Sequence, residues 1–181
     1  MANADTPFGF RATGHMKDLQ PFNRDADEAT AIFRGDMINA MADGNVQAAA
    51  AGATSMLGAV AGGTTVDYGA KSLLAASVAG VLLVHWDPDQ MYICQAQTGD
   101  TNAQTALFAN VDHVAGTGST VTGLSGHELN IGVQTTTAGG GFKLIDHVIS
   151  ADNDVTLENA KYKCVLNTGE ALLRLITGLD T

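Results

Sequence analysis

Short apolar runs alternate with turn-forming residues along most of this chain. Each run is too short for a helix of several turns, and glycine, asparagine, aspartate or proline residues separate most of them. Runs of this kind, bounded by turn residues, are typical of β-strands. We predict strands over residues 31–34, 37–41, 46–48, 57–61, 81–86, 91–96, 110–114, 128–133, 142–149 and 162–166.

The connections between these runs favour hairpins. Residues 42–45 (Ala-Asp-Gly-Asn) and 87–90 (Asp-Pro-Asp-Gln) are rich in the residue types that form tight turns, and each is predicted to close a hairpin. Residues 101–108 are the best candidate for one short helix, because a threonine or an asparagine can cap its first turn. Residues 170–179 fit a last strand or a helical turn. The whole pattern predicts a mainly β, single-domain fold, either a β-barrel or a β-sandwich.

The first residues follow a different pattern. Residues 1–27 are polar, contain Pro7 and Pro21, and show neither the helical nor the strand period. We therefore predict an extended N-terminal arm over residues 1–27 and a β-rich domain over residues 28–181.

Two aromatic residues and one cation follow the first proline of this arm. Because a proline disfavours the helical conformation of the residue before it, the segment is expected to be extended. An extended segment with apolar anchors and a cation is suited to holding a neighbouring protein. The candidate contact residues are Pro7, Phe8, Phe10 and Arg11.

Composition and charge narrow the range of partners. The formal net charge is −10 at pH 7, and no lysine or arginine lies between Lys71 and Lys143. Because a nucleic-acid interface needs a basic face, direct nucleic-acid binding is not expected. No apolar run approaches the roughly 20 residues of a membrane-spanning helix, and the polar start does not predict a signal peptide. Charged residues make up only 15% of the chain, which suggests that other subunits cover part of its surface.

The two cysteines, Cys94 and Cys164, each lie inside an apolar run. No CxxC pair and no cysteine–histidine spacing accompanies them, so we predict free, buried thiols.

The five histidines are scattered, and none has the spacing of a zinc site. We predict that they lie on the surface or at the rim of the fold. His127 and Glu128 offer a base beside a carboxylate, but adjacent residues of a strand point to opposite faces. Ser125 lacks the GxSxG setting of a hydrolase nucleophile. The sequence therefore predicts no catalytic residue, no cofactor and no metal.

Three further segments match functional motifs but fit local structure better. Residues 34–36 (Arg-Gly-Asp) match a cell-adhesion tripeptide, and we predict a turn or bulge there. Residues 152–158 lack the sixth-position glycine and twelfth-position acid of a calcium loop, so an Asx turn is predicted. The glycine-rich residues 116–123 lack the lysine of a P-loop and are predicted to form a mobile surface or interface loop.

Several short motifs, taken in order, resemble a family of virion proteins of tailed bacteriophages. Residues 2–11 (Ala-Asn-Ala-Asp-Thr-Pro-Phe-Gly-Phe-Arg) are similar to the start of that family. The resemblance continues in the same order through residues 35–38, 57–61, 87–89, 102–108, 116–129 and 144–146. The chain departs from the family pattern at residues 62–65 (Gly-Gly-Thr-Thr), where an aromatic Tyr-Trp-Pro stretch is usual.

The resemblance implies a capsid decoration, or cement, protein with a β-tulip-like barrel or sandwich. Such a protein is made in the host cytoplasm, binds the outer face of the phage head and stabilises the expanded lattice of the major capsid protein. The implied partners are the major capsid protein and further copies of the chain, as a homotrimer or a homodimer. On this hypothesis the arm contacts the shell, and removing residues 1–12 leaves a folded domain that no longer binds.

Two alternatives stay open at this point. One is another virion component, such as a tail-tube, head-fibre base or minor capsid protein, which copy number in purified particles would distinguish. The other is a polysaccharide-active enzyme, which needs a cleft with paired carboxylates. The acids on the predicted strands, Asp112, Glu128 and Asp146, show no such pairing in the sequence.

Overall fold

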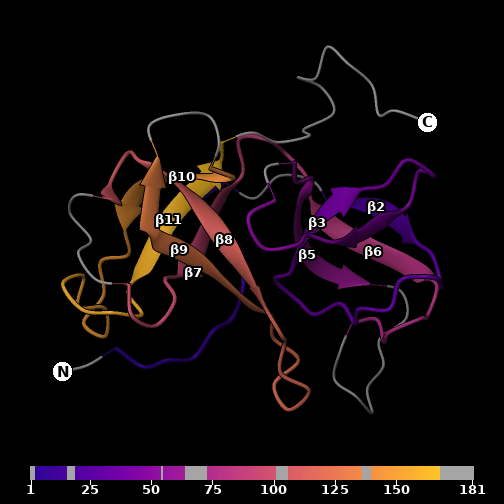
Figure 1. The fold of residues 1–181 in the computed structure, drawn as a ribbon, viewed down its shortest axis with the longest axis horizontal. Coiled ribbons are helices and arrows are strands. Elements are labelled where there is room, and N and C mark those ends of the chain that lie inside the picture. The colour runs from indigo at the N-terminus through magenta and orange to yellow at the C-terminus, as the bar shows by residue number, and fades with distance from the viewer. Residues whose placement is uncertain are drawn as a thin grey trace.

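Two antiparallel β-sheets make up the part of the chain that the computed structural model describes, which is residues 3–15, 19–53, 55–63, 73–100, 106–135 and 140–167. Sheet A has the strand order β1-β7-β11-β10-β8-β9 and consists of β1 (Arg11–Thr13), β7 (Met91–Gln95), β8 (Asn110–Gly116), β9 (Gly126–Thr135), β10 (Phe142–His147) and β11 (Lys161–Leu166). Sheet B has the order β2-β6-β5-β3-β4 and consists of β2 (Leu19–Arg24), β3 (Met37–Ala40), β4 (Val46–Ala48), β5 (Gly58–Gly63) and β6 (Gly80–His85). The two sheets lie next to each other, and the β8–β9 hairpin extends beyond them (Figure 1).

The prediction of a mainly β fold is confirmed, and the two sheets fit the sandwich alternative. Strands β3 to β11 lie within a few residues of the predicted runs, whereas the run over 31–34 forms only isolated bridges at Ile32 and Arg34. The predicted hairpin at residues 42–45 joins β3 and β4, and Met41 donates its N–H to the Asn45 carbonyl at 2.8 Å.

The second predicted hairpin is wrong. Residues 87–90 do form a turn, but β6 pairs with β2 and β5 while β7 pairs with β1 and β11, so this turn carries the chain from sheet B to sheet A. Both edges of β6 are filled by other strands, and the alternating side chains of Tyr92 and Cys94 on β7 enter the core of sheet A instead.

The expected irregular arm over residues 1–27 contains two strands, which is a correction to the sequence analysis. The second of them, β2, includes Pro21, which cannot donate to a ladder. Proline is tolerated there because, among the described strands, β2 lies at an edge and pairs only with β6. The other strand, β1, is three residues long and too short to show an alternation in the sequence.

Two apolar cores share the middle of sheet B. Met37 of β3 and Ala59 of β5 pack with the side chains of sheet A, whereas their neighbours Ile38 and Val60 pack in a second core with Leu82 and Val84 of β6. Because successive strand residues point to opposite faces, β3 and β5 are buried on both sides. The second core is completed by Ile32, Val46, Leu57, Leu73 and Leu74.

Some predictions fall wholly or partly outside the described residues. Residues 101–105 of the candidate helix over 101–108 lie outside the described residues. The tail over 170–179 lies entirely outside them, because the description ends at residue 167. Among the described residues, the structure has no helix that is long and apolar enough to cross a membrane.

Arg24 holds the loops at one end of sheet B. Its side chain is only 2% exposed, and its guanidinium donates to four backbone carbonyl oxygens at 2.6 to 2.8 Å. These carbonyls belong to Ala75, Val78, Glu28 and Thr30. Burial lowers the pKa of Arg24, and the nearby charges of Glu28 and Asp25 act in the opposite direction.

We expect Arg24→Met to lower the free energy of unfolding by about 2 to 4 kcal/mol, because four backbone carbonyl oxygens lose the donors of a buried guanidinium. Urea unfolding measures this loss. Arg34→Met is the matched control, since the Arg34 side chain is exposed and lies outside this network, and it should change stability by no more than about 0.5 kcal/mol. Equal stability of the two variants would contradict this role of Arg24.

Candidate functional site

The turn at residues 34–36 joins the two sheets. Phe10 donates its N–H to the Gly35 carbonyl oxygen at 2.8 Å, and Gly35 donates its own N–H to the Val60 carbonyl of β5 at 2.9 Å. Ser125, just before β9, donates its N–H to the Arg34 carbonyl at 3.0 Å. The predicted turn at the Arg-Gly-Asp tripeptide is therefore confirmed, and three separate segments are hydrogen-bonded to it.

Two glycines allow these segments to approach closely. Gly9 and Gly35 both have positive φ, 72° and 94°, which L-residues with a side chain rarely adopt. A Cβ at Gly35 would lie 2.7 Å from the Phe8 carbonyl oxygen, and one at Gly9 would collide with Ser125. The junction therefore needs glycine both for backbone conformation and for space.

We expect Gly35→Ala to destabilise the fold far more than Gly44→Ala. Both glycines have positive φ, but a Cβ at Gly44 has no atom within 4 Å, so alanine there should cost about 1 kcal/mol. At Gly35 the collision with backbone adds to this strain, and a loss of about 3 kcal/mol or more is expected. Urea unfolding measures the free energy of unfolding of both variants. Equal losses would mean that Gly35 is needed only for its positive φ and not for space.

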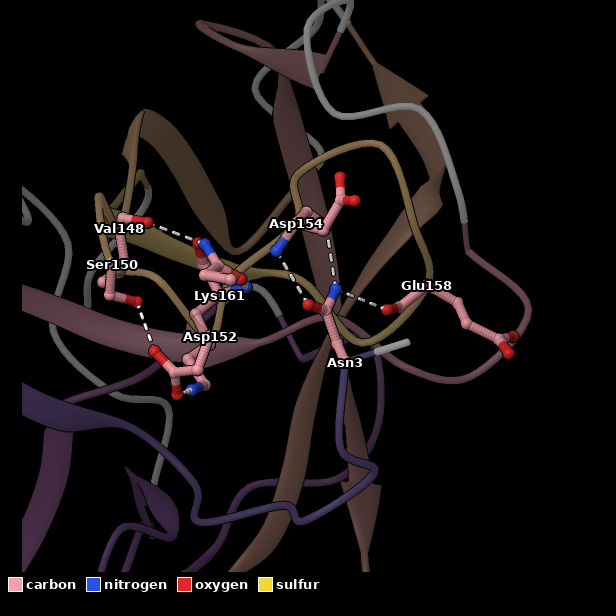
Figure 2. A network of polar contacts seen from close by, with 8 residues as sticks. Asn3, Val148, Ser150, Asp152, Asp154, Glu158 and Lys161 are labelled. Carbon is pink, nitrogen blue, oxygen red and sulfur yellow. Dashed lines mark hydrogen bonds and ion pairs between the residues drawn. The ribbon is translucent and has the colours of Figure 1, made fainter. Parts of the chain in front are cut away.

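Both ends of the N-terminal segment are hydrogen-bonded to the rest of the fold. The Asn3 side chain enters the loop between β10 and β11, where its amide donates to the carbonyls of Asp154 (2.8 Å) and Glu158 (2.9 Å) and accepts the N–H of Asp154 (2.8 Å) (Figure 2). Downstream, β1 pairs with β7 in sheet A.

The loop that receives Asn3 is itself ordered by side-chain hydrogen bonds. The Asn153 amide donates to the carbonyls of Val148 and Lys161, and Lys161 forms an ion pair with Asp152 at 2.6 Å (Figure 2). Asp154 accepts the N–H of Thr156, which confirms the Asx turn predicted for residues 152–158.

The four candidate contact residues have different environments. Phe10 is 2% exposed and stacks on Phe142, with ring centroids 4.4 Å apart, so it belongs to the core of this chain. Phe8 is half-buried, and the exposed Arg11 lies over its ring at 4.9 Å from the centroid. Pro7 is half-buried. The expectation that Phe10 is an anchor for a partner is therefore corrected: Phe10 lies in the core of this chain, while Phe8, on the other side of the positive-φ Gly9, and Arg11 remain at the surface.

Phe8 and Arg11 line a groove of about 360 Å³ between the two sheets, which we term the junction groove. Arg34 of the turn, Val60 of β5 and Leu124 of the β8–β9 hairpin also line it. The groove thus combines two exposed guanidinium groups with apolar walls. The sequence around Arg34 does not indicate a contact residue, because its tripeptide indicates only a turn.

The described part of the chain provides no carboxylate partner for either arginine of the groove. Neither Arg11 nor Arg34 forms an ion pair with any residue that the structure describes. By contrast, Lys161 and Lys163 pair with Asp152 and Asp146 at 2.6 and 3.0 Å. Local positive charge at the groove stands out in a chain of net charge −10.

On the inner side of the same turn, Asp36 lies in a buried polar cluster with Ser125 and His127. The Asp36 carboxylate accepts the Phe33 N–H at 2.7 Å, and its other oxygen lies 3.7 Å from Nε2 of His127. His113 is also buried, with its ring centroid 5.3 Å from that of His127. The prediction that the histidines lie at the surface is therefore wrong for these two, which occupy inward positions of β8 and β9.

This cluster does not have the connectivity of a catalytic triad. Nδ1 of His127 accepts the Met37 N–H at 3.3 Å, so its proton is on Nε2, which faces Asp36. Ser125 Oγ accepts the His127 N–H at 2.9 Å and hydrogen-bonds Asp36. In a triad the imidazole lies between hydroxyl and carboxylate and takes the hydroxyl proton. Here neither imidazole nitrogen contacts the serine hydroxyl, and the groups bind the junction backbone.

Burial shifts the pKa values of both ionisable groups. It raises the pKa of Asp36 to about 6, against the lowering effect of hydrogen bonds from Ser125 and Phe33. It lowers the pKa of His127 to about 3, and neighbouring His113 adds to this lowering. At neutral pH the imidazole is thus uncharged.

We expect Asp36→Asn to change how stability depends on pH. Because the folded-state pKa of Asp36 lies above its ordinary value of 3.8, its contribution to stability is greatest below about pH 4 and is lost as the pH rises through 6. The stability of the wild type relative to the variant should therefore fall by up to about 3 kcal/mol between about pH 4 and pH 8. Urea unfolding of both proteins over this pH range measures the difference. A constant difference would contradict the raised pKa.

Two of the acids on the predicted strands, Asp146 and Glu128, have polar side chains beside them. Asp146 is paired with Lys163, and Glu128 is half-buried next to Gln95, whose amide lies 3.5 Å from it. Burial, with Asp5 and Asp100 nearby, raises the pKa of Glu128 to about 7. Within the described residues, no three histidine, cysteine or acidic side chains are placed to hold a metal ion.

Both cysteines are free and buried, as predicted from their apolar surroundings. They lie on the adjacent strands β7 and β11, where Cys94 is opposite Tyr162 and Cys164 is opposite Tyr92. Burial raises the pKa of both thiols.

No family model, curated protein or solved structure matches this chain.

Proposed function

We propose that this chain is a structural protein of a tailed-phage head, which binds the outer face of the capsid and links neighbouring subunits of the major capsid protein. The observation that carries the proposal is the junction groove, where the exposed Arg11 and Arg34 flank apolar walls in an otherwise acidic chain. Arginine and aromatic side chains around an apolar centre are typical of surfaces that bind proteins.

The buried polar groups support the same proposal. Asp36, Ser125 and His127 accept hydrogen bonds from backbone N–H groups at the junction. These side chains therefore help to fix the backbone that forms the groove. A rigid backbone behind a binding surface lowers the conformational entropy that binding costs.

The physical role of such a protein is thermodynamic linkage. A protein that binds the expanded shell better than other states stabilises that state, and the stabilisation grows with the logarithm of its concentration relative to Kd. Because the capsid repeats the same site by symmetry, modest affinities at each site add up over the shell. A small groove can therefore be sufficient.

We expect the charge-reversed variant Arg11→Glu/Arg34→Glu to bind expanded capsids roughly tenfold or more weakly, because it removes both cations of the groove. Co-sedimentation with expanded capsids of the phage that encodes the chain measures this. Lys143→Glu makes the same kind of charge change at an exposed site on β10 and should bind as the wild type does.

Point variants are preferable to removal of residues 1–12, because that deletion would also remove Phe10 from the core. Undiminished binding by the double variant would overturn the assignment of the groove. A wild-type protein that fails to sediment with capsids, or a low copy number in purified particles, would overturn the proposed function.

A further inference from the structure

The junction groove contains an open strand edge. Among the described residues, strand β1 is the outermost strand of sheet A and pairs only with β7. The Phe10 N–H points away from β7, because it donates to the Gly35 carbonyl in the turn. Backbone groups alternate in direction along a strand, so Ala12, two residues later, directs its N–H and C=O to the same side as Phe10 does. Ala12 also lines the groove.

The pairing within sheet A supports this direction independently. Ala96 donates its N–H to Ala160, on the side of β7 that faces β11. Because backbone groups alternate in direction along a strand, the N–H and C=O groups of Cys94 and Tyr92 also point toward β11. Those of Ile93 and Met91 point toward β1. These two residues lie opposite Arg11 and Thr13, which leaves the backbone of Ala12 pointing away from the sheet.

We propose that the junction groove binds an extended, acidic segment of a partner protein, which adds to the open edge of β1 and places carboxylates against Arg11 and Arg34. This inference rests on the proposed function, because both take the junction groove as the binding surface. It adds that the bound segment is extended and acidic. Addition of a strand to a sheet edge supplies main-chain hydrogen bonds, and flanking side chains supply selectivity.

Charge complementarity indicates that the bound segment carries negative charge. Arg11 and Arg34 lack ion-pair partners among the described residues, and guanidinium groups bind carboxylates with two parallel hydrogen bonds. The Phe8 ring, 4.9 Å from the Arg11 guanidinium, supports that side chain on one face. A neutral or basic segment would leave both cations uncompensated.

The size of the groove indicates a short segment. Its volume of about 360 Å³ is near the lower end of the range for small-ligand pockets, so it can hold only a few side chains. Val60, Ala61 and Leu124 offer apolar contact to a residue between the carboxylates. The occupant is therefore a few residues of strand from a partner, and not a folded domain.

The test uses the full chain and a fluorescently labelled peptide of about eight residues in which threonine and glutamate alternate around one central valine, a length that allows strand addition. Fluorescence anisotropy should show saturable binding that weakens as salt is added. Arg11→Gln/Arg34→Gln should weaken it roughly tenfold or more, while Lys143→Gln should leave it unchanged. The NMR signal of the Ala12 amide should shift on binding.

Two matched peptides test the two parts of the inference. Replacing every glutamate by glutamine removes the carboxylates, and methylating the backbone nitrogens next to the valine removes the strand's donors. Each change should weaken binding clearly. Equal binding of either peptide, equal competition by a single-stranded oligonucleotide, or no binding of the acidic peptide up to about 1 mM would overturn the inference.

This outcome is separate from that of the capsid experiment. If the peptide binds as expected but the protein does not sediment with capsids, the groove chemistry stands and the proposed function fails. If the protein sediments with capsids but the peptide binds without regard to Arg11 and Arg34, the proposed function stands and this inference fails.

Discussion

The close contact between the backbones at Gly9 and Gly35 is the constraint on which the rest of the structure depends. Gly35 is hydrogen-bonded on one side to Phe10 and on the other to Val60, so it fixes the N-terminal segment against sheet B. Each glycine has a φ that disfavours side chains, and each has no space for one. The core position of Phe10 and the surface position of Phe8 both follow from this contact.

The same turn separates two electrostatic environments. Arg34 is exposed at the junction groove, whereas Asp36, two residues later, is buried against Phe33 and His127. The turn therefore places a cation at the junction groove of a chain that is acidic overall, and a carboxylate in the interior.

Local sequence predicts most strands of this fold, because their apolar runs and turn residues are short-range signals. The chain's path between sheets is not local, so the turn at residues 87–90 reads as a hairpin although it joins different sheets. The inward histidines His113 and His127 were missed because polarity suggests exposure, while their burial depends on partners distant in sequence. For the groove, Phe8 and Arg11 were predictable from the arm, but Arg34 was not, since nothing nearby in the sequence links residue 34 to residue 11.

The placement of β1 has a consequence for the order in which the protein can be made. Strands β2 to β6 are continuous in the chain, so sheet B can pair while later residues are still being synthesised. Sheet A must wait, because β11 lies between β7 and β10, and Asn3 binds a loop more than 150 residues away. Contacts of such long range form slowly. The residues that line the junction groove end at Leu124, so all of them are synthesised before β10 and β11, the strands that complete the sheet to which β1 belongs.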